Sequence, residues 1–142
     1  MRLRVEAEVK PTEAREKVEA AIKLIFPILE LSLVGNSLVG ESTSVESLER
    51  LHQLLRQQAI RDSARSVMLR SRRDNVVRFM LNRQVAFVGK VSFTAGESPL
   101  GPIVVTLEAP DIEGLIDYLA LRTREGKPFA RSDIDQQRQQ SP

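Results

Sequence analysis

Alternating apolar and polar positions predict several strands in this chain. Residues 3–9 alternate strictly between apolar and charged side chains, which is the period of a strand with one buried face. Residues 29–33 repeat the pattern, and residues 38–42 follow the pair Gly35-Asn36, which is typical of a tight turn. Three later segments are also predicted strands: residues 76–81, 88–93 and 103–107.

Apolar residues spaced by three and four predict helices between these strands. The first helix is expected to have Thr12 at its N-cap and to end at Phe26, before Pro27. Its buried face would be formed by Val18, Ala21, Ile22 and Ile25. A final helix is expected to begin after Pro110-Asp111 and to include Leu115, Ile116 and Leu119.

The long helical segment after Ser44, its expected cap, contains two apolar faces that do not coincide. With successive side chains rotated by 100° around the helix axis, the apolar residues of the first half and those of the second half point in different directions. A single straight helix therefore cannot bury both sets. We therefore predict a break at residues 57–59 and a second helix that ends near Asp74-Asn75. The first face consists of Val45, Leu48, Leu51 and Leu55, and the second of Ile60, Ala64 and Val67.

These elements predict one α+β domain, with a mixed or antiparallel sheet covered by helices. We expect the domain to occupy residues 1–126 and a polar C-terminal tail to occupy residues 127–142. No apolar run reaches the length of a membrane-spanning helix, and the N-terminus lacks the pattern of a secretory signal. The absence of cysteine is compatible with the reducing cytoplasm, which is the expected location.

Positive charge is concentrated in the middle of the chain, although the net charge is only +2. Residues 50–90 contain ten Lys and Arg against two Asp and Glu, whereas residues 1–49 contain six against nine. Nine of the ten middle cations are arginine, whose planar fork of donors suits phosphate. The cluster therefore indicates an anionic partner or, equally, pairing with the acidic segments on either side.

The stretch LNRQVAFVGKVSF at residues 81–93 invites comparison with the base-stacking strand of an RNA-recognition motif. The glycine position of that motif holds Gln84, and two aromatic positions hold Val85 and Lys90, so the stacking rings are missing. We expect Phe79, Phe87 and Phe93 to be core residues of a hairpin. Only Arg83, Gln84 and Lys90 would face outward.

The sequence predicts no catalytic, metal or cofactor site. Gly89-Lys90 lacks both the preceding glycine and the following hydroxyl residue of a phosphate-binding loop. His52 is the only histidine, and its position at the edge of an apolar helix face is typical of a packed side chain. The acidic pairs Asp111/Glu113 and Asp133/Asp135 are interpreted as helix-end and tail charges.

The candidate nucleic-acid-binding residues are seven cations of the middle segment. Arg61, Arg65 and Arg72 fall on one side of the predicted second helix, where they could contact phosphates. The others are placed at the helix end or on the following strands. The full set is Arg61, Arg65, Arg72, Arg73, Arg78, Arg83 and Lys90.

Several motifs together resemble an uncharacterised archaeal family whose members are commonly labelled as RNA-binding. They are VEAEVKPTEAREKVEAAI, SVESLERLHQLLRQQAIRDSAR, LNRQVAFVGKVSF and SPLGPIVVTLEAPDIEGLIDYLA, in that order. The resemblance implies a fold similar to the large-subunit ribosomal protein that binds 5S ribosomal RNA, a cytoplasmic location and self-association into dimers. It implies no catalytic residues.

The leading hypothesis is a non-enzymatic RNA-binding protein that contacts phosphates through the arginine-rich helix and adjoining strand. A ribosome-related setting is the more specific form of this hypothesis. The first alternative is an interaction or structural homodimer without nucleic acid. In it the middle arginines pair with the acidic segments 13–19 and 111–117, within or between subunits. The second alternative is an enzyme that binds a small anionic substrate with the same arginines, next to Asn82.

Overall fold

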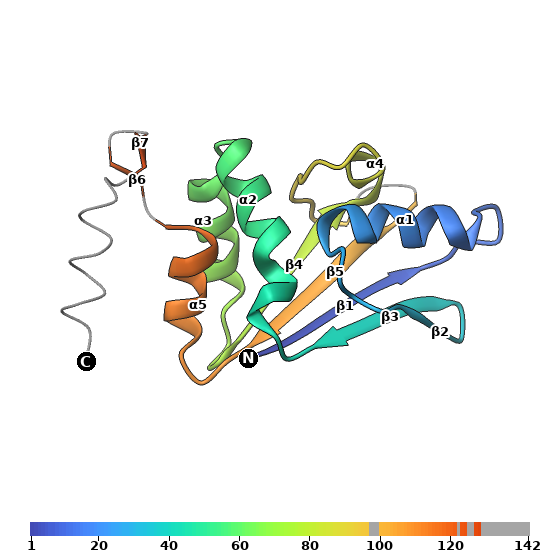
Figure 1. Cartoon of the computed structure of the whole chain (residues 1–142), viewed down its shortest axis with the longest axis horizontal. Helices are drawn as coiled ribbons and strands as arrows, with labels where there is room; N and C mark the ends of the chain where they lie inside the picture. The colour runs from blue at the N-terminus through green and yellow to red at the C-terminus, as the bar shows by residue number, and fades with distance from the viewer. Residues whose placement is uncertain (97–99, 122, 125–126, 129–142) are drawn as a thin grey trace.

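The computed structural model describes residues 1–96, 100–121, 123–124 and 127–128. No helix in these ranges is long and apolar enough to cross a membrane. The elements, shown in Figure 1, are β1 (Arg2–Glu8), α1 (Arg15–Ile25), β2 (Ser32–Val34), β3 (Ser37–Ser42), the 3-10 helix η1 (Val45–Leu48), α2 (Glu49–Gln57), α3 (Arg61–Ser71), β4 (Val76–Asn82), α4 (Arg83–Ala86), β5 (Pro102–Glu108), α5 (Ile112–Leu119), β6 (Thr123–Arg124) and β7 (Lys127–Pro128).

Five strands form one antiparallel sheet in the order β2-β3-β1-β5-β4, which confirms the predicted α+β class. Arg4 of the central strand β1 lies opposite Glu41 of β3 and Thr106 of β5, and Arg78 of β4 also lies opposite Thr106. Because directly opposite residues share a face of the sheet, these side chains form one polar row across it.

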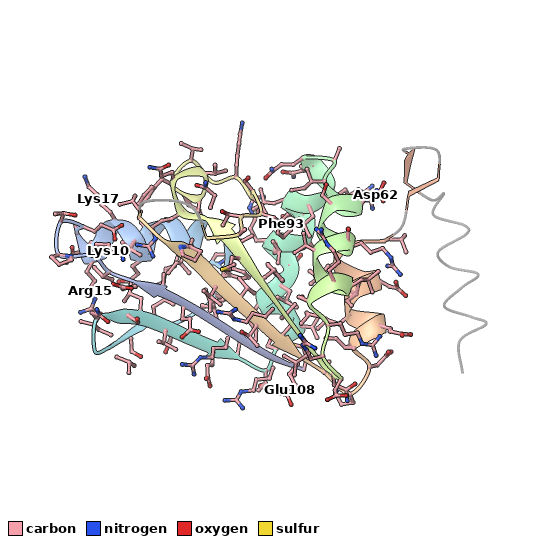
Figure 2. All side chains as sticks on the ribbon, turned by 180° about the vertical axis from the view of Figure 1, so that it is seen from behind. Lys10, Arg15, Lys17, Asp62, Phe93 and Glu108 are labelled. Atoms are coloured by element: carbon pink, nitrogen blue, oxygen red, sulfur yellow. The ribbon has the colours of Figure 1, made fainter. Side chains whose placement is uncertain are left out.

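The helices cover the other face of the sheet (Figure 1). Leu3, Val5 and Ala7 of β1 are buried on that face, because strand side chains alternate between the two sides. The four apolar residues predicted for the face of α1 are all buried against them. Viewed from behind, the strands pass in front of the helices, so the polar row lies on the face that no helix covers (Figure 2).

The predicted break between the two middle helices is confirmed. α2 ends at Gln57, and Ala59 has a φ of +56°, a left-handed conformation that redirects the chain into α3. The Gln58 side chain fixes this corner, because its amide donates to the Val91 carbonyl and its oxygen accepts from the Val91 N–H, both at 2.8 Å. The corner therefore joins α2, α3 and the segment after α4.

The prediction of a strand at residues 88–93 is wrong. Asn82 instead caps the short helix α4 by accepting a 3.0 Å hydrogen bond from the Val85 N–H. Gly89 then adopts a φ of +74°, and the returning segment pairs with β4 through a single isolated bridge between Leu81 and Phe93 rather than as a strand. Apolar content alone suggested a strand here, but the Asn82 cap and the glycine turn bend this segment.

Three predicted boundaries also differ from the structure by two residues or more. α1 begins at Arg15 after Ala14 rather than after Thr12, and α3 ends at Ser71 rather than near residue 74. Residues 29–31 are not in β2, but they pass close to β3: a Cβ at Gly40 would lie 2.7 Å from Leu31 Cδ2 and 3.1 Å from the Glu30 carbonyl oxygen.

Ser44 precedes the 3-10 helix η1 without capping it, and Val45 is exposed rather than buried. The expectation of a polar tail at residues 127–142 falls largely outside the described residues, apart from β7, which pairs with β6. The division at residue 126 stays a prediction.

Candidate nucleic-acid interface

Arg83, a predicted RNA contact, lies in the core. Its side chain has no exposed area, so the expectation that it faces outward is wrong. It donates 2.7 Å and 3.3 Å hydrogen bonds to the Glu13 carboxylate and the Pro102 carbonyl. Glu13 also accepts from the Lys10 N–H at 2.9 Å. Arg83 therefore holds α4, the start of β5 and the loop before α1 together.

Arg65 and Arg72, two further candidates on α3, pair with acidic residues of α5. Arg65 donates to the Asp117 carboxylate at 2.5 Å and to the Ala120 carbonyl at 3.3 Å. Arg72 donates to the Glu113 carboxylate at 2.7 Å. Glu113 and Asp117 are one helical turn apart, which places both carboxylates along the side of α5 that faces α3. These pairs match the first alternative, in its form where the arginines pair with acidic residues of the same subunit.

Arg61, the first residue of α3, is about nine-tenths buried, with 8% of its surface exposed. Within the described ranges its guanidinium has no hydrogen bond and no ion pair within 4 Å. Burial lowers the pKa of Arg61, the nearby Arg56 charge lowers it further, and Asp62 partly opposes both effects. The charge of Arg56 therefore lies near the partly buried Arg61.

Arg73, Arg78 and Lys90 are exposed, and none has an ion-pair partner among the residues that the structure describes. Arg73 lies in the turn between α3 and β4, and Arg78 points to the uncovered face of the sheet. Arg70, which the sequence reasoning left out of the site, is exposed in the last turn of α3 and donates only to the Ser66 carbonyl.

Six cations of the middle segment that have no carboxylate partner in the described ranges therefore lie in two groups, one at each end of α3; Arg50 on α2, which donates to Gln53, lies outside both. We call Arg56, Arg61 and Lys90 the corner group, because Lys90 precedes Val91, which Gln58 holds at the α2–α3 corner. We call Arg70, Arg73 and Arg78 the β4 group. The eleven residues of α3 separate the two groups by about 16 Å of helix.

Among the described residues, the aromatic side chains offer no platform for stacking several bases. Phe79 is buried and packs edge to face against Phe93 at 5.6 Å. Phe87 is exposed, so its predicted place in the core is wrong. His52 stacks on Tyr118 between α2 and α5 at 4.6 Å, which agrees with its interpretation as a packed side chain.

Comparison with known proteins places this arrangement in a family. Residues 2–109 match the model of a family described as RNA binding. A protein of Sulfurisphaera tokodaii named UPF0201 protein is 42% identical over 136 residues, covering 92% of this chain and 94% of the relative. The chain belongs to the UPF0201 family. A UPF0201 protein of Aeropyrum pernix is 39% identical over 135 residues and covers 90% of both chains.

The solved structure of a UPF0201 protein from Methanococcus jannaschii has the same fold. Its TM-score is 0.82 at 35% identity, and the alignment covers 92% of this chain and 100% of the other. The resemblance to an uncharacterised archaeal RNA-binding family is thereby confirmed. Similarity to the 5S-RNA-binding ribosomal protein stays a prediction, as does the dimer.

Proposed function

We propose that the protein is a non-enzymatic RNA-binding module that contacts the phosphate backbone through the exposed cations of the β4 group. The observation that carries this proposal is the distribution of partners among the middle arginines. Arg65, Arg72 and Arg83 are engaged by carboxylates, whereas Arg73 and Arg78 are exposed without one in the described ranges. Exposed guanidiniums can form bidentate hydrogen bonds with phosphate oxygens without first breaking an ion pair.

The family description adds the class of partner, because the model described as RNA binding includes the whole of α3 and β4. The lack of a stacking platform favours contact with phosphates over recognition of bases. Binding should then depend weakly on sequence and strongly on salt. In its more specific form, the proposal names ribosomal RNA as the target and the cytoplasm as the location.

The test is the salt dependence of binding to a labelled 20-nucleotide poly(U) and to a 20-base-pair RNA duplex. For a single strand, each phosphate contact contributes about 0.7 to the slope of log K against log salt concentration. The double variant R73Q/R78Q should lower the slope on poly(U) by about 1.4. If the wild-type protein shows no salt-sensitive binding to either RNA, the proposal is wrong.

A matched control removes the same charge elsewhere. Arg15 and Lys17 lie at the far end of the molecule from Asp62 in α3, as Figure 2 shows. Both are exposed, with no ion-pair partner in the described part of the chain. The variant R15Q/K17Q should leave the slope close to the wild-type value. An equal fall in both variants would mean that overall charge, rather than the β4 group, controls binding.

A protein-interaction function is the second candidate, supported by apolar side chains exposed around α4. Val88 is 71% exposed, and Leu24 of α1, which approaches Gly89, is 45% exposed. Phe87, which is also exposed, directly precedes Val88 in the chain. The predicted homodimer would be supported if V88D changed the molar mass measured by light scattering from dimer to monomer while RNA binding persisted.

A further inference from the structure

A surface hollow of about 350 Å³ lies at the end of the sheet where β1 and β4 begin and β5 ends. We call it the strand-end hollow. Three polar and three apolar residues line it: Arg2, Asn75, Glu108, Met1, Ala109 and Pro110. Figure 2 shows Glu108 at this end of the sheet, far from Lys10 and Arg15 at the other. The strand-end hollow therefore combines hydrogen-bonding groups of both kinds with apolar surface.

Glu108 presents an unused carboxylate on the uncovered face of the sheet. It lies directly opposite Arg2 of β1, a position in which the two Cβ atoms are about 4.5–5.5 Å apart. The guanidinium of Arg2 nevertheless donates to Glu41 of β3, at 3.3 Å and 3.4 Å. Among the described residues no ion pair or side-chain hydrogen bond engages the Glu108 carboxylate. Its oxygens are therefore free acceptors next to a guanidinium.

Asn75 connects the strand-end hollow to the β4 group. It lies in the turn closed by the bridge between Arg73 and Val76, and its carbonyl accepts a 3.1 Å hydrogen bond from the Ala109 N–H. That bond holds the turn against the end of β5. The side-chain amide of Asn75 is exposed and has no hydrogen-bond partner in the described ranges. It adds an N–H donor group and a carbonyl acceptor to the strand-end hollow.

The strand-end hollow is also one diagonal step from Arg78, the proposed phosphate contact. Arg78 lies opposite Thr106, and Glu108 is two residues further along β5, so Arg78 and Glu108 share the uncovered face. Diagonal neighbours in adjacent strands are about 7–8 Å apart. A comparable distance separates the phosphate of a nucleotide from the polar edge of its base. A nucleotide whose phosphate contacts Arg78 can therefore place its base in the strand-end hollow.

We propose that the strand-end hollow binds one unstacked guanine base of single-stranded RNA, selected by the carboxylate of Glu108. Guanine presents two adjacent donors, N1–H and the N2 amino group, and a carboxylate accepts both in parallel. The O6 atom of guanine is next to N1 and accepts from the guanidinium of Arg2 or the amide of Asn75. The apolar residues of the strand-end hollow contact the flat face of the ring.

The other three bases fit the carboxylate of Glu108 less well. Uracil, cytosine and adenine each place an acceptor atom next to the donor on their Watson–Crick edge, and that acceptor repels a carboxylate. The inference rests on the proposed RNA-binding function. It adds a preference at one base to binding that otherwise depends on phosphates.

The first arm of the test compares labelled 20-nucleotide poly(U) with oligomers in which every fourth nucleotide is guanosine, adenosine or cytidine. The wild-type protein should bind the guanosine oligomer about tenfold more tightly than the other three, as expected for one well-formed set of base contacts. E108Q keeps the shape of the side chain but replaces one acceptor by a donor, so this preference should disappear. E16Q, which removes an exposed carboxylate of α1, is the matched control and should keep it.

Two further results of this arm are decisive. Salt-sensitive binding with equal affinity for all four oligomers would overturn the guanine site and leave the proposed function intact. E108Q should also unfold at the same temperature as the wild type, because Glu108 is exposed and has no side-chain partner in the described ranges. A strongly lowered midpoint for E108Q would overturn the inference by showing that the fold already uses this carboxylate.

The second arm does not depend on RNA binding. Guanosine monophosphate and uridine monophosphate are titrated separately into isotope-labelled full chain, and the two carry the same phosphate, so the difference between them reports the base. In the NMR spectrum guanosine monophosphate should shift the Asn75 side-chain amide and the Ala109 backbone amide more than uridine monophosphate does. E108Q should abolish this excess.

The two arms separate failure of the guanine site from failure of the proposed function. An excess shift in the wild type, without binding to any of the RNA oligomers, would leave the strand-end hollow as a guanine site and show that the RNA-binding proposal is wrong. Equal shifts from both nucleotides, or an excess that persists in E108Q, would overturn the guanine site whether or not poly(U) binds through the β4 group.

Discussion

Arg83 and Glu13 form a buried ion pair, 2.7 Å apart, between residues separated by 70 positions in the sequence. The Arg83 side chain has no exposed area, and 8% of the Glu13 side chain is exposed. The pair joins the loop before α1 to the start of α4, on the helix-covered side of the sheet. An arginine that the sequence suggested for RNA therefore serves the fold.

Glu13→Gln should destabilise the protein, because it leaves the Arg83 charge buried without its partner. Loss of one member of a buried pair typically costs about 3–5 kcal/mol. The free energy of unfolding in urea measures this directly. Glu16→Gln, an exposed position in the first turn of α1, is the control and should change stability by less than about 0.5 kcal/mol. Equal effects of the two variants would show that the pair contributes nothing specific.

Neutralising the acidic side of α5 should strengthen RNA binding. The double variant E113Q/D117N releases Arg65 and Arg72 from their carboxylates and makes both available to phosphates. Affinity for poly(U) should rise, and the slope against salt should steepen by up to about 1.4. The control E16Q removes a carboxylate from α1. A rise in affinity without a steeper slope would contradict new arginine contacts.

Alternation and helical spacing were sufficient to predict much of the fold. They located β1, β3, β4 and β5, and the mismatch of two apolar faces located the break before α3. These patterns report which side of an element is buried, so they succeed wherever one face meets the core. They failed at residues 88–93, because the Asn82 cap starts a short helix before this segment and the turn at Gly89 then redirects the chain.

The candidate site was less predictable than the fold. A count of charges identifies the arginine-rich segment, but it does not distinguish exposed cations from paired ones. Arg65 and Arg72 are paired through α5, more than 40 positions away in the sequence. Arg73 and Arg78 remain available because of the turn after α3. Arg56 and Arg70 were not among the seven candidate residues.

Acid should weaken the ion pairs on the uncovered face of the sheet. The guanidinium of Arg4, which donates to Glu41, together with the charge of Arg2, holds the pKa of Glu41 below its ordinary value of 4.5. A carboxyl whose pKa is lower when folded stabilises the protein above the unfolded pKa, and this contribution disappears as the pH falls through the folded pKa.

The midpoint of thermal unfolding, measured at low salt between about pH 3 and pH 6, should therefore fall less steeply with acid in Glu41→Gln than in the wild type. The difference should shrink at high salt, because the pair is exposed and screened. Identical pH profiles at low salt would contradict a lowered pKa for Glu41.

The clamp of Gln58 on Val91 should be important for the corner between α2 and α3. Gln58→Ala removes both hydrogen bonds and leaves the N–H and carbonyl of a buried residue unpaired. A loss of about 1–3 kcal/mol is expected in the free energy of unfolding. Hydrogen exchange at the Val91 amide should accelerate in the variant. Unchanged protection of that amide would show that the clamp is not formed in solution.

The central claim is that the partners of the arginines, rather than their number, determine where RNA is contacted. Comparing R73Q/R78Q with R65Q/R72Q tests it most directly, because each variant removes two charges from the same segment. On poly(U), the first variant should lower the salt slope by about 1.4, and the second by less than half as much. Equal losses, or a larger loss in R65Q/R72Q, would contradict the account.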